Sequence, residues 1–291
     1  MLLLCLIWSF QQIALKAVAA DITPTMQIAL RSAGAAVLVA ALMRWRGERM
    51  DWTAWRPGAV VALLFALEFI FVGESLQRTS ASHTVVFLYT APLFAALGLH
   101  WKLPAERLTW LQWSGITLAF VGVATAFLGK DTPAAHGPAV TSVLGDFLAL
   151  LGAVAWGATT VAIRTTRLSQ TAPTQTLLYQ LLGAAVLLLM VAVLSGTCTL
   201  RFTPAVAASL LFQIVVVSFI SFLTWFWLLR QYLASRLGVF SFLTPVFGVV
   251  LGVVLLDEPI ELRFVLGAAM VLTGIVIVSA HSMLATLWKK A

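Results

Sequence analysis

Charged residues are scarce in this chain. Asp, Glu, Lys and Arg make up 10% of its 291 residues, against about 25% in an ordinary soluble domain. Apolar residues make up 61%, and the mean hydropathy is +1.00. A soluble fold of this composition would have to place most of its apolar side chains on its own surface. The composition therefore excludes soluble and disordered proteins and predicts a membrane protein.

Cysteine is nearly absent, and so are the signatures of catalysis. The two cysteines, Cys5 and Cys198, fit no metal or redox spacing. The chain has no HExxH or GxSxG motif, no phosphate-binding loop and no aspartate pair with metal-ligand spacing. We therefore expect no enzyme, no catalytic or metal-ligating residue and no cofactor. The 18 Lys and Arg against 11 Asp and Glu stand singly at the ends of apolar runs, so the expected partner is the lipid bilayer and not nucleic acid.

Ten apolar segments follow one another along the chain. A helix that spans a bilayer needs about 20 apolar residues. Segments of this kind lie at 2–20, 25–43, 57–77, 81–101, 109–128, 146–164, 174–195, 205–229, 235–256 and 263–283. The first has no basic n-region and carries Gln11, Gln12 and Lys16, so it is interpreted as a span and not as a cleaved signal peptide. The predicted fold class is an all-α integral membrane protein with ten transmembrane helices.

Basic residues are distributed unequally between the two sides. With the N-terminus inside, twelve fall on the cytoplasmic side and five outside. The twelve are Arg44, Arg46, Arg49, Arg56, Lys102, Arg107, Arg164, Arg167, Arg230, Arg236, Lys289 and Lys290, and the five are Lys16, Arg78, Lys130, Arg201 and Arg263. This asymmetry predicts a multi-pass protein of the cell (inner) membrane with both termini cytoplasmic.

The two halves of the chain resemble each other. Residues 81–94 align without gaps on 234–247 with six identities in fourteen. Further matches in the same order are Trp8 with Trp156, Lys16 with Arg164, Glu106 with Glu258, Gly115 with Gly267 and Gly122 with Gly274. The chain is therefore predicted to contain two five-helix repeats, 1–129 and 145–283, an external linker at 130–144 and a cytoplasmic tail at 284–291. Because five is odd, the second repeat is inverted, an arrangement typical of transporters with a central cavity that opens to either side in turn.

These features resemble the EamA-type members of the drug/metabolite transporter superfamily. The resemblance rests on a Trp near the start of each unit, a Pro in each fourth helix (Pro92, Pro245) and a Glu before each Gly-bearing fifth helix. One departure is that Glu258-Pro259 stands as Glu106-Arg107 in the first unit. More narrowly, the chain is similar to the bacterial YddG group of aromatic and neutral amino-acid exporters. The resemblance implies ten helices, a central cavity and export of small metabolites.

Candidate cavity residues recur on single helix faces. Trp8, Gln12 and Lys16 are spaced by four, and Trp156, Thr160 and Arg164 repeat that stripe. Gly152 and Gly157 are expected to leave room for a ligand beside Trp156. Further candidates in the fourth, eighth and ninth helices are His83, Phe87, Thr90, Pro92, Ser221, Trp225, Phe240, Thr244 and Pro245. The alternative for the two tryptophans is a contact between helices, with Lys16 and Arg164 reaching the interface. The alternative for the prolines is a packing kink, for Ser221 a hydrogen bond back to its own helix, and for His83 no functional role.

Among the ionisable side chains inside the spans of the first unit, four stand out: Arg31, Glu68, Glu74 and His83. Such residues are costly in a membrane and are functional candidates by default. Glu68 is a cavity candidate, and Arg31 with Glu68 or Glu74 would form an outer gate or bind the amino and carboxyl groups of a substrate. The alternative is an ion pair that only orders the first unit.

The function that we expect is a monomeric secondary transporter that exports small metabolites, most of all aromatic and other neutral amino acids, by alternating access. The alternatives are an exporter of drugs or other metabolites of the same superfamily, and a membrane scaffold subunit that transports nothing. Because no nucleotide-binding motif is present, the expected drive is a gradient, and facilitated diffusion is the prediction.

Reporter fusions test the predicted topology. A reporter fused after Ala291 should read cytoplasmic, and one inserted in 130–144 should read external, because the positive-inside asymmetry and the odd number of helices per repeat require it. A cytoplasmic reading from the linker would contradict the ten-span inverted arrangement.

Overall fold

The computed structural model describes residues 1–127, 142–196, 198–231, 241 and 243–288. These residues form helices and short loops, with one isolated bridge between Ile22 and Leu200 as the only β pairing among them. The α-helices are α1 (Leu2–Ala17), α2 (Pro24–Trp45), α3 (Trp55–Arg78), α4 (Ala81–Leu88), α5 (Ala91–Lys102), α6 (Trp110–Phe127), α7 (Val143–Thr165), α8 (Pro173–Leu194), α9 (Pro204–Leu211), α10 (Phe222–Gln231), α12 (Leu243–Leu256) and α13 (Leu262–Trp288). The short helices are η1 (Trp52–Ala54), η2 (Pro104–Glu106), η3 (Arg167–Gln170) and η4 (Phe212–Ser221), the last of which is a π-helix.

The helices are long and apolar enough for a membrane. Six stretches have the length and composition of a span, and four shorter apolar helices (Leu2–Ala17, Trp110–Ala126, Leu243–Leu256 and Leu262–Val278) complete the ten that the sequence predicts. α13 continues to Trp288, beyond the predicted end of the last span. The all-helical membrane fold predicted from the sequence is confirmed. Of the predicted linker, 130–144, residues 130–141 lie outside the described residues.

Proline and capping residues set where several helices begin. Pro24 and Pro204 each stand at the first turn of a helix, where a missing N–H costs nothing. The hydroxyl oxygens of Thr23 and Thr203 accept from the free N–H groups of the same turns. Pro92 acts differently, because it cannot continue a helix begun upstream. The fourth span is accordingly two helices, α4 and α5, which meet at Tyr89 and Thr90.

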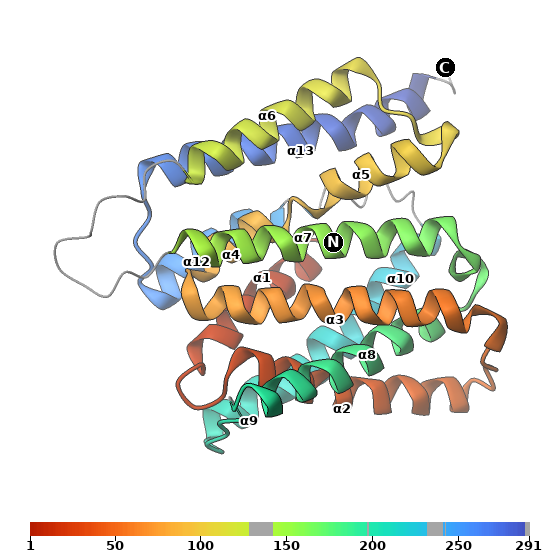
Figure 1. The fold of residues 1–291 in the computed structure, drawn as a ribbon, viewed down its shortest axis with the longest axis vertical. Helices are drawn as coiled ribbons and strands as arrows, with labels where there is room; N and C mark the ends of the chain where they lie inside the picture. The colour runs from red at the N-terminus through yellow and green to blue at the C-terminus, as the bar shows by residue number, and fades with distance from the viewer. Residues whose placement is uncertain (128–141, 197, 232–240, 242, 289–291) are drawn as a thin grey trace.

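Helices from before and after the linker are interleaved. α3 lies between α7 and α8, α2 packs on α8, α1 packs on α12, and α4 contacts both α12 and α7 (Figure 1). α6 and α13 lie side by side along one edge of the molecule, next to α5 (Figure 1). The two predicted repeats therefore share one core and are not separate bodies.

Glycines allow the closest of these approaches. A Cβ atom on Gly115 would lie 2.7 Å from the carbonyl oxygen of Gly274, and one on Gly122 would lie 2.6 Å from that of Gly267. The contact is reciprocal, because a Cβ on Gly267 would lie 2.6 Å from the carbonyl oxygen of Gly122. Such exchange of partners is what two-fold-related helices make. α6 and α13 pack together through their glycines, as the sequence predicts.

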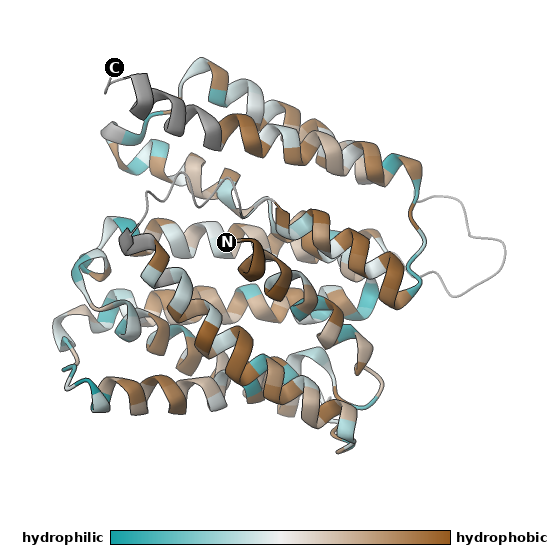
Figure 2. Ribbon diagram, turned by 180° about the vertical axis from the view of Figure 1, so that it is seen from behind, coloured by the Kyte–Doolittle hydropathy of each residue, from teal (hydrophilic) through white to brown (hydrophobic). Residues whose placement is uncertain are grey.

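The bundle has two ends, which we name after residues of α7. The Asp146 end holds the start of α7 with the starts of α2 and α4, and the Arg164 end holds its last turn with the ends of α2 and α5. Hydrophobic side chains dominate the helices between the two ends, and hydrophilic ones gather at the ends (Figure 2). Four strongly exposed tryptophans lie at the Arg164 end: Trp45, Trp52, Trp101 and Trp110. Exposed tryptophans are typical of the membrane–water interface.

Candidate functional site

The structure brings three predicted cavity residues together. The indole N–H of Trp8 in α1 donates to the hydroxyl of Ser221, at 2.9 Å. The ring of Trp8 meets the ring of Trp225 in α10 edge to face, with centroids 5.5 Å apart. Both tryptophans are half-buried and Ser221 is buried. Trp8 therefore joins α1 to the eighth span in two ways, through its ring contact with Trp225 and through its hydrogen bond to the Ser221 hydroxyl.

The eighth span is wound as a π-helix beside this pair. The ten residues Phe212–Ser221 form it, and its buried side chains include Gln213, Ser218 and Ser221. The amide of Gln213 donates to the carbonyl of Gln11, at 3.0 Å, while the hydroxyl of Ser218 is buried without a hydrogen-bond partner. π-Helical turns are rare and occur frequently at functional sites. The widened turn presents polar side chains toward α1 and α2.

Arg31 is buried next to the π-helix. Its side chain is 1% exposed, its Nη1 donates to Gln213 Oε1 at 2.7 Å, and its guanidinium lies over the ring of Phe69, 4.5 Å from the centroid. The Nε of the same guanidinium has no hydrogen-bond partner. One donor of this cation is thus left over inside the bundle.

Glu68 is a buried carboxyl group that interacts electrostatically with Arg31. Its Oε2 is buried without a hydrogen-bond partner, and no salt bridge joins Arg31 to Glu68, both of which the structure describes. An unpaired buried charge is expensive. Gln12 of α1 adds a third orphaned group, because its Oε1 is buried and unpartnered as well. The charge network thus differs from the expected one: Arg31 binds Gln213, and Glu74 pairs with Arg78 one turn further along α3.

Trp156 lies in a packed environment. Its ring meets that of Tyr89 edge to face, with centroids 5.3 Å apart. The expectation that Gly157 leaves room beside it is wrong, because a Cβ on Gly157 would lie 2.7 Å from Cβ of Phe94 in α5. A Cβ on Gly152 would lie 3.4 Å from the carbonyl of Glu68, an ordinary contact distance. Because α5 fills the space at Gly157, the ligand space is expected on the Trp8 side.

The other cavity candidates take part in hydrogen bonds to backbone carbonyls or pack in the core. Thr160 and Thr90 donate to the carbonyls of Trp156 and Phe87, and the carbonyl of Thr244 accepts from the hydroxyl of Ser9 at 2.7 Å. Phe87 is buried in the core. Pro92 and Pro245 stand in the first turns of α5 and α12. Phe240 lies outside the described residues.

A buried polar cluster closes the Asp146 end. His83 Nδ1 is hydrogen-bonded to both carboxylate oxygens of Asp146, at 3.0 and 3.2 Å, and its ring stacks on that of Phe264 with centroids 3.8 Å apart. The hydroxyl of Thr79 donates to the same carboxylate at 2.7 Å. Sequence reasoning passed over Asp146, although an acidic residue in the first turn of a spanning segment is a recognisable signal.

Glu258 completes this closure from the turn between α12 and α13. Its carboxylate accepts from the backbone N–H groups of Ala81 (2.6 Å) and Ser82 (2.9 Å) and from the Ser82 hydroxyl (2.6 Å). These are free donors of the first turn of α4, and a helix N-terminus favours an anion. Lys16 lies 3.8 Å from the carboxylate and donates to the carbonyl of Thr79. The sequence marks Glu258 and Lys16 as repeat-matched positions and does not indicate that they pair.

Contacts at the Arg164 end are more exposed. Arg164 pairs with Glu106 of η2, and Gln175 of α8 accepts from the backbone N–H of Asp51, at 2.9 Å. Asp51 itself accepts from the hydroxyl and the N–H of Thr53, and these bonds hold the pKa of its carboxyl below the ordinary value. This end is joined by surface contacts, whereas the Asp146 end is joined by buried ones.

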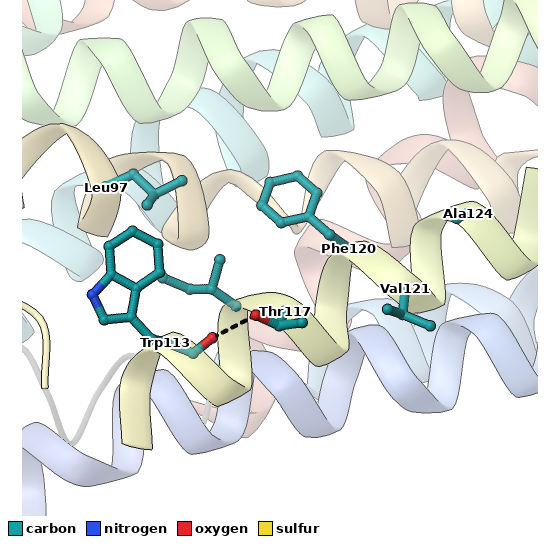
Figure 3. Close-up of a pocket in the computed structure, with 7 residues that line it drawn as sticks. Leu97, Trp113, Thr117, Phe120, Val121 and Ala124 are labelled. Carbon is teal, nitrogen blue, oxygen red and sulfur yellow. Dashed lines mark hydrogen bonds between the residues drawn. The ribbon is translucent and has the colours of Figure 1, made fainter. Parts of the chain in front are cut away.

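A groove on the outside of the bundle runs between α5 and α6 (Figure 3). Its volume is about 430 Å³, and its lining is almost wholly apolar, with Leu97, Trp113 and Phe120 among the side chains. The hydroxyl of Thr117 donates to the carbonyl of Trp113 (Figure 3). The groove lacks a charged side chain and lies on the outside of the bundle, so it is not the candidate site.

Comparison with known proteins decides the family. The sequence profile of the EamA-like transporter family matches residues 1–128 and again 143–280. The chain belongs to the EamA-like transporter family. It is a multi-pass membrane protein and a transporter, as the resemblance in its sequence implies.

Related proteins cover the chain almost completely. The uncharacterized transporter YoaV of Bacillus subtilis (strain 168) is 23% identical over 273 residues, 93% of this chain and 92% of its own. An uncharacterized transporter of Archaeoglobus fulgidus is 28% identical over 284 residues, 93% and 94% of the two chains. One solved crystal structure of a protein superposes with a TM-score of 0.67 at 21% identity, over 96% of this chain and 94% of the other. That likeness shows the fold.

Removal of the Asp146 carboxylate should destabilise the protein strongly. Asp146→Ala leaves Thr79 and His83 without their acceptor, and breaking a buried pair costs about 3–5 kcal/mol. Asp146→Asn keeps one acceptor oxygen and should lose less. Equilibrium unfolding of purified protein measures the change in free energy.

Glu74→Ala is the matched control at the same end. Its pair with Arg78 is partly exposed, so its loss should cost about 1 kcal/mol or less. Equal losses for Asp146→Ala and Glu74→Ala would show that the buried cluster does not hold this end.

Proposed function

We propose that this EamA-family transporter exports neutral amino acids, aromatic ones included, by alternating access, and that it binds them between α1, α2, α3 and the π-helix. The cell membrane, cytoplasmic termini and a monomeric state are part of this proposal. Export is the direction that the resemblance of the sequence implies, and the positive-inside asymmetry places the Arg164 end in the cytoplasm. We further propose facilitated diffusion, because the chain has no nucleotide-binding motif. The carboxylates buried in its second half, Asp146 and Glu258, are bound to groups at the Asp146 end and do not match Glu68 as a relay.

The observation that carries the proposal is the unpaired state of Arg31 and Glu68. Each is buried, each has an atom without a hydrogen-bond partner, and the two do not form a salt bridge. A zwitterionic amino acid offers a carboxylate to the free guanidinium N–H and an ammonium to the free carboxylate oxygen. Charge-assisted hydrogen bonds of this kind are the strong ones, and one ligand would satisfy both orphaned groups.

The surrounding aromatic rings favour a substrate with an apolar side chain. The Trp8–Trp225 pair and Phe69, which lies under the guanidinium of Arg31, come from α1, α10 and α3. Aromatic contacts add about 0.5–1.5 kcal/mol beyond area burial. Gln12 and Ser218 supply further unpartnered polar atoms. The same rings would also hold an apolar cation, so the carboxylate of the substrate is the group that distinguishes amino acids from drugs.

Counterflow in proteoliposomes tests the substrate class. L-Phenylalanine should exchange faster than phenethylamine, which lacks the carboxylate, and faster than 3-phenylpropionate, which lacks the ammonium, because each analogue leaves one buried charge unpaired. Arg31→Gln should raise the phenylalanine concentration at half-saturation by about tenfold or more, as expected for one lost charge-assisted hydrogen bond. Arg31→Lys should restore part of the loss.

The analogues also provide the control for folding. Phenethylamine does not need Arg31, so its low rate should be unchanged in Arg31→Gln, whereas a misfolded variant would lose every substrate in proportion. Phenethylamine as the best substrate would instead favour an exporter of cationic drugs. No counterflow with any of the three compounds would contradict the amino-acid proposal.

A further inference from the structure

Two ion pairs join the halves of the chain, one at each end of the bundle. At the Asp146 end Lys16 of α1 pairs with Glu258, at 3.8 Å. At the Arg164 end Arg164 of α7 pairs with Glu106 of η2. Lys16 and Glu106 lie in the first segment that matches the family, and Arg164 and Glu258 lie in the second. Each pair therefore takes its cation from one segment and its anion from the other.

The two pairs are equivalent by the internal repeat. Lys16 aligns with Arg164, and Glu106 aligns with Glu258. In an arrangement with two-fold symmetry, a contact between residue i of one unit and residue j of the other recurs with the units exchanged. Lys16–Glu258 and Glu106–Arg164 have this relation. The glycine contacts of α6 with α13, Gly115 with Gly274 and Gly122 with Gly267, show the same exchange.

The structure breaks this symmetry in one respect, the burial of the pairs. The side chains of Lys16 and Glu258 are 22% and 3% exposed, whereas those of Arg164 and Glu106 are 49% and 31% exposed. Glu258 also holds the first turn of α4 through three hydrogen bonds. An exposed ion pair contributes little, while a desolvated carboxylate bound to a helix N-terminus contributes more. The same contact is thus buried at one end and exposed at the other.

Glu258 lies in the closely packed contact between α4 and α12. A Cβ on Gly252 would lie 2.5 Å from Glu258 Oε2, and one on Gly248 would lie 2.5 Å from Cγ1 of Val85 in α4. Asp257, just before Glu258, has a left-handed backbone with φ of 50°, and Glu258 N donates back to the carbonyl of Gly252. The turn after α12 therefore directs the carboxylate onto α4, and release of Glu258 would free this interface.

We propose that these two pairs are alternate latches of the transport cycle, Lys16–Glu258 closing the Asp146 end and Arg164–Glu106 closing the Arg164 end. Both pairs are formed in the structure, and the first is the more deeply buried of the two. The four residues are positioning residues, because they act on the helices and not on the substrate. The inference rests on the proposed alternating access, and it adds the residues that select which end is open.

Two matched thiol reporters measure the state of each end. Gln12 is buried on α1 one turn before Lys16, and Thr160 is half-buried on α7 one turn before Arg164. In a chain with Cys5→Ala and Cys198→Ser, either Gln12→Cys or Thr160→Cys is introduced, and its rate of reaction with a small water-soluble thiol reagent is measured. Position 160 should react faster than position 12 in the parent chain.

Each of the variants Glu258→Gln and Lys16→Gln should change the thiol reaction rates at positions 12 and 160 in opposite directions. Loss of a charge-assisted hydrogen bond should raise the rate at position 12 by about tenfold and lower the rate at position 160. The double variant should show less than the sum of the two single effects, because both residues belong to one contact. Arg164→Gln should leave position 12 protected.

The control variant is Glu74→Gln, which breaks a pair at the same end within α3 alone and should change neither rate. Misfolding would raise both rates together, so opposite shifts identify a change of state. Unchanged rates in Glu258→Gln, or equal rises at both positions, would overturn the latch proposal. The assay needs no substrate. Opposite shifts of the two rates without amino-acid counterflow would refute the proposed substrate and support the latches. Amino-acid counterflow without opposite shifts would support the substrate and refute the latches.

Discussion

The carboxylate of Glu258 at the start of α4 is the contact on which the closed end of the molecule depends. The first turn of any helix has N–H groups with no partner inside the helix, and a bilayer offers no water to replace one. Here a side chain from the other half of the chain supplies the acceptor. Asp146, bound to Thr79 and His83, adds a second crossing between the halves. The end is closed because the halves satisfy each other's polar groups.

The irregular parts of the backbone surround the candidate site. The fourth span is interrupted at Tyr89 and Thr90, and the eighth is wound as a π-helix over Phe212–Ser221. Departures from the α-helix are tolerated inside a membrane where protein or a cavity covers them. Both lie between helices and not on the smooth contact of α6 with α13, which the glycines keep tight. The regular helices α2 and α3 supply Arg31 and Glu68, and the π-helix adds Gln213, Ser218 and Ser221.

Much of the fold follows from the sequence because the bilayer imposes length and hydropathy on every span. Hydropathy and self-similarity were sufficient for the ten helices and for the glycine contact of α6 with α13. The stripes that carry Trp8 and Ser221 were also visible, since helical spacing places residues on one face. The structure adds that these two residues touch.

What the sequence could not supply was the partner of each side chain. A single chain shows which residues share a helix face and not which helices adjoin. Arg31 was paired with a carboxylate by charge alone, whereas packing places Gln213 beside it. Gly157 was interpreted as open space, whereas α5 fills it. Asp146 drew no notice because its partners, Thr79 and His83, are more than sixty residues away.

The central claim is that the two ends of the bundle are coupled, so that loosening one favours closure of the other. Hydrogen–deuterium exchange at the backbone amides of Ala81 and Ser82, which Glu258 holds, reports directly on the Asp146 end. The account predicts that Glu106→Gln, a change at the opposite end, slows exchange at these two amides relative to the unaltered protein. Unchanged or faster exchange there would contradict it.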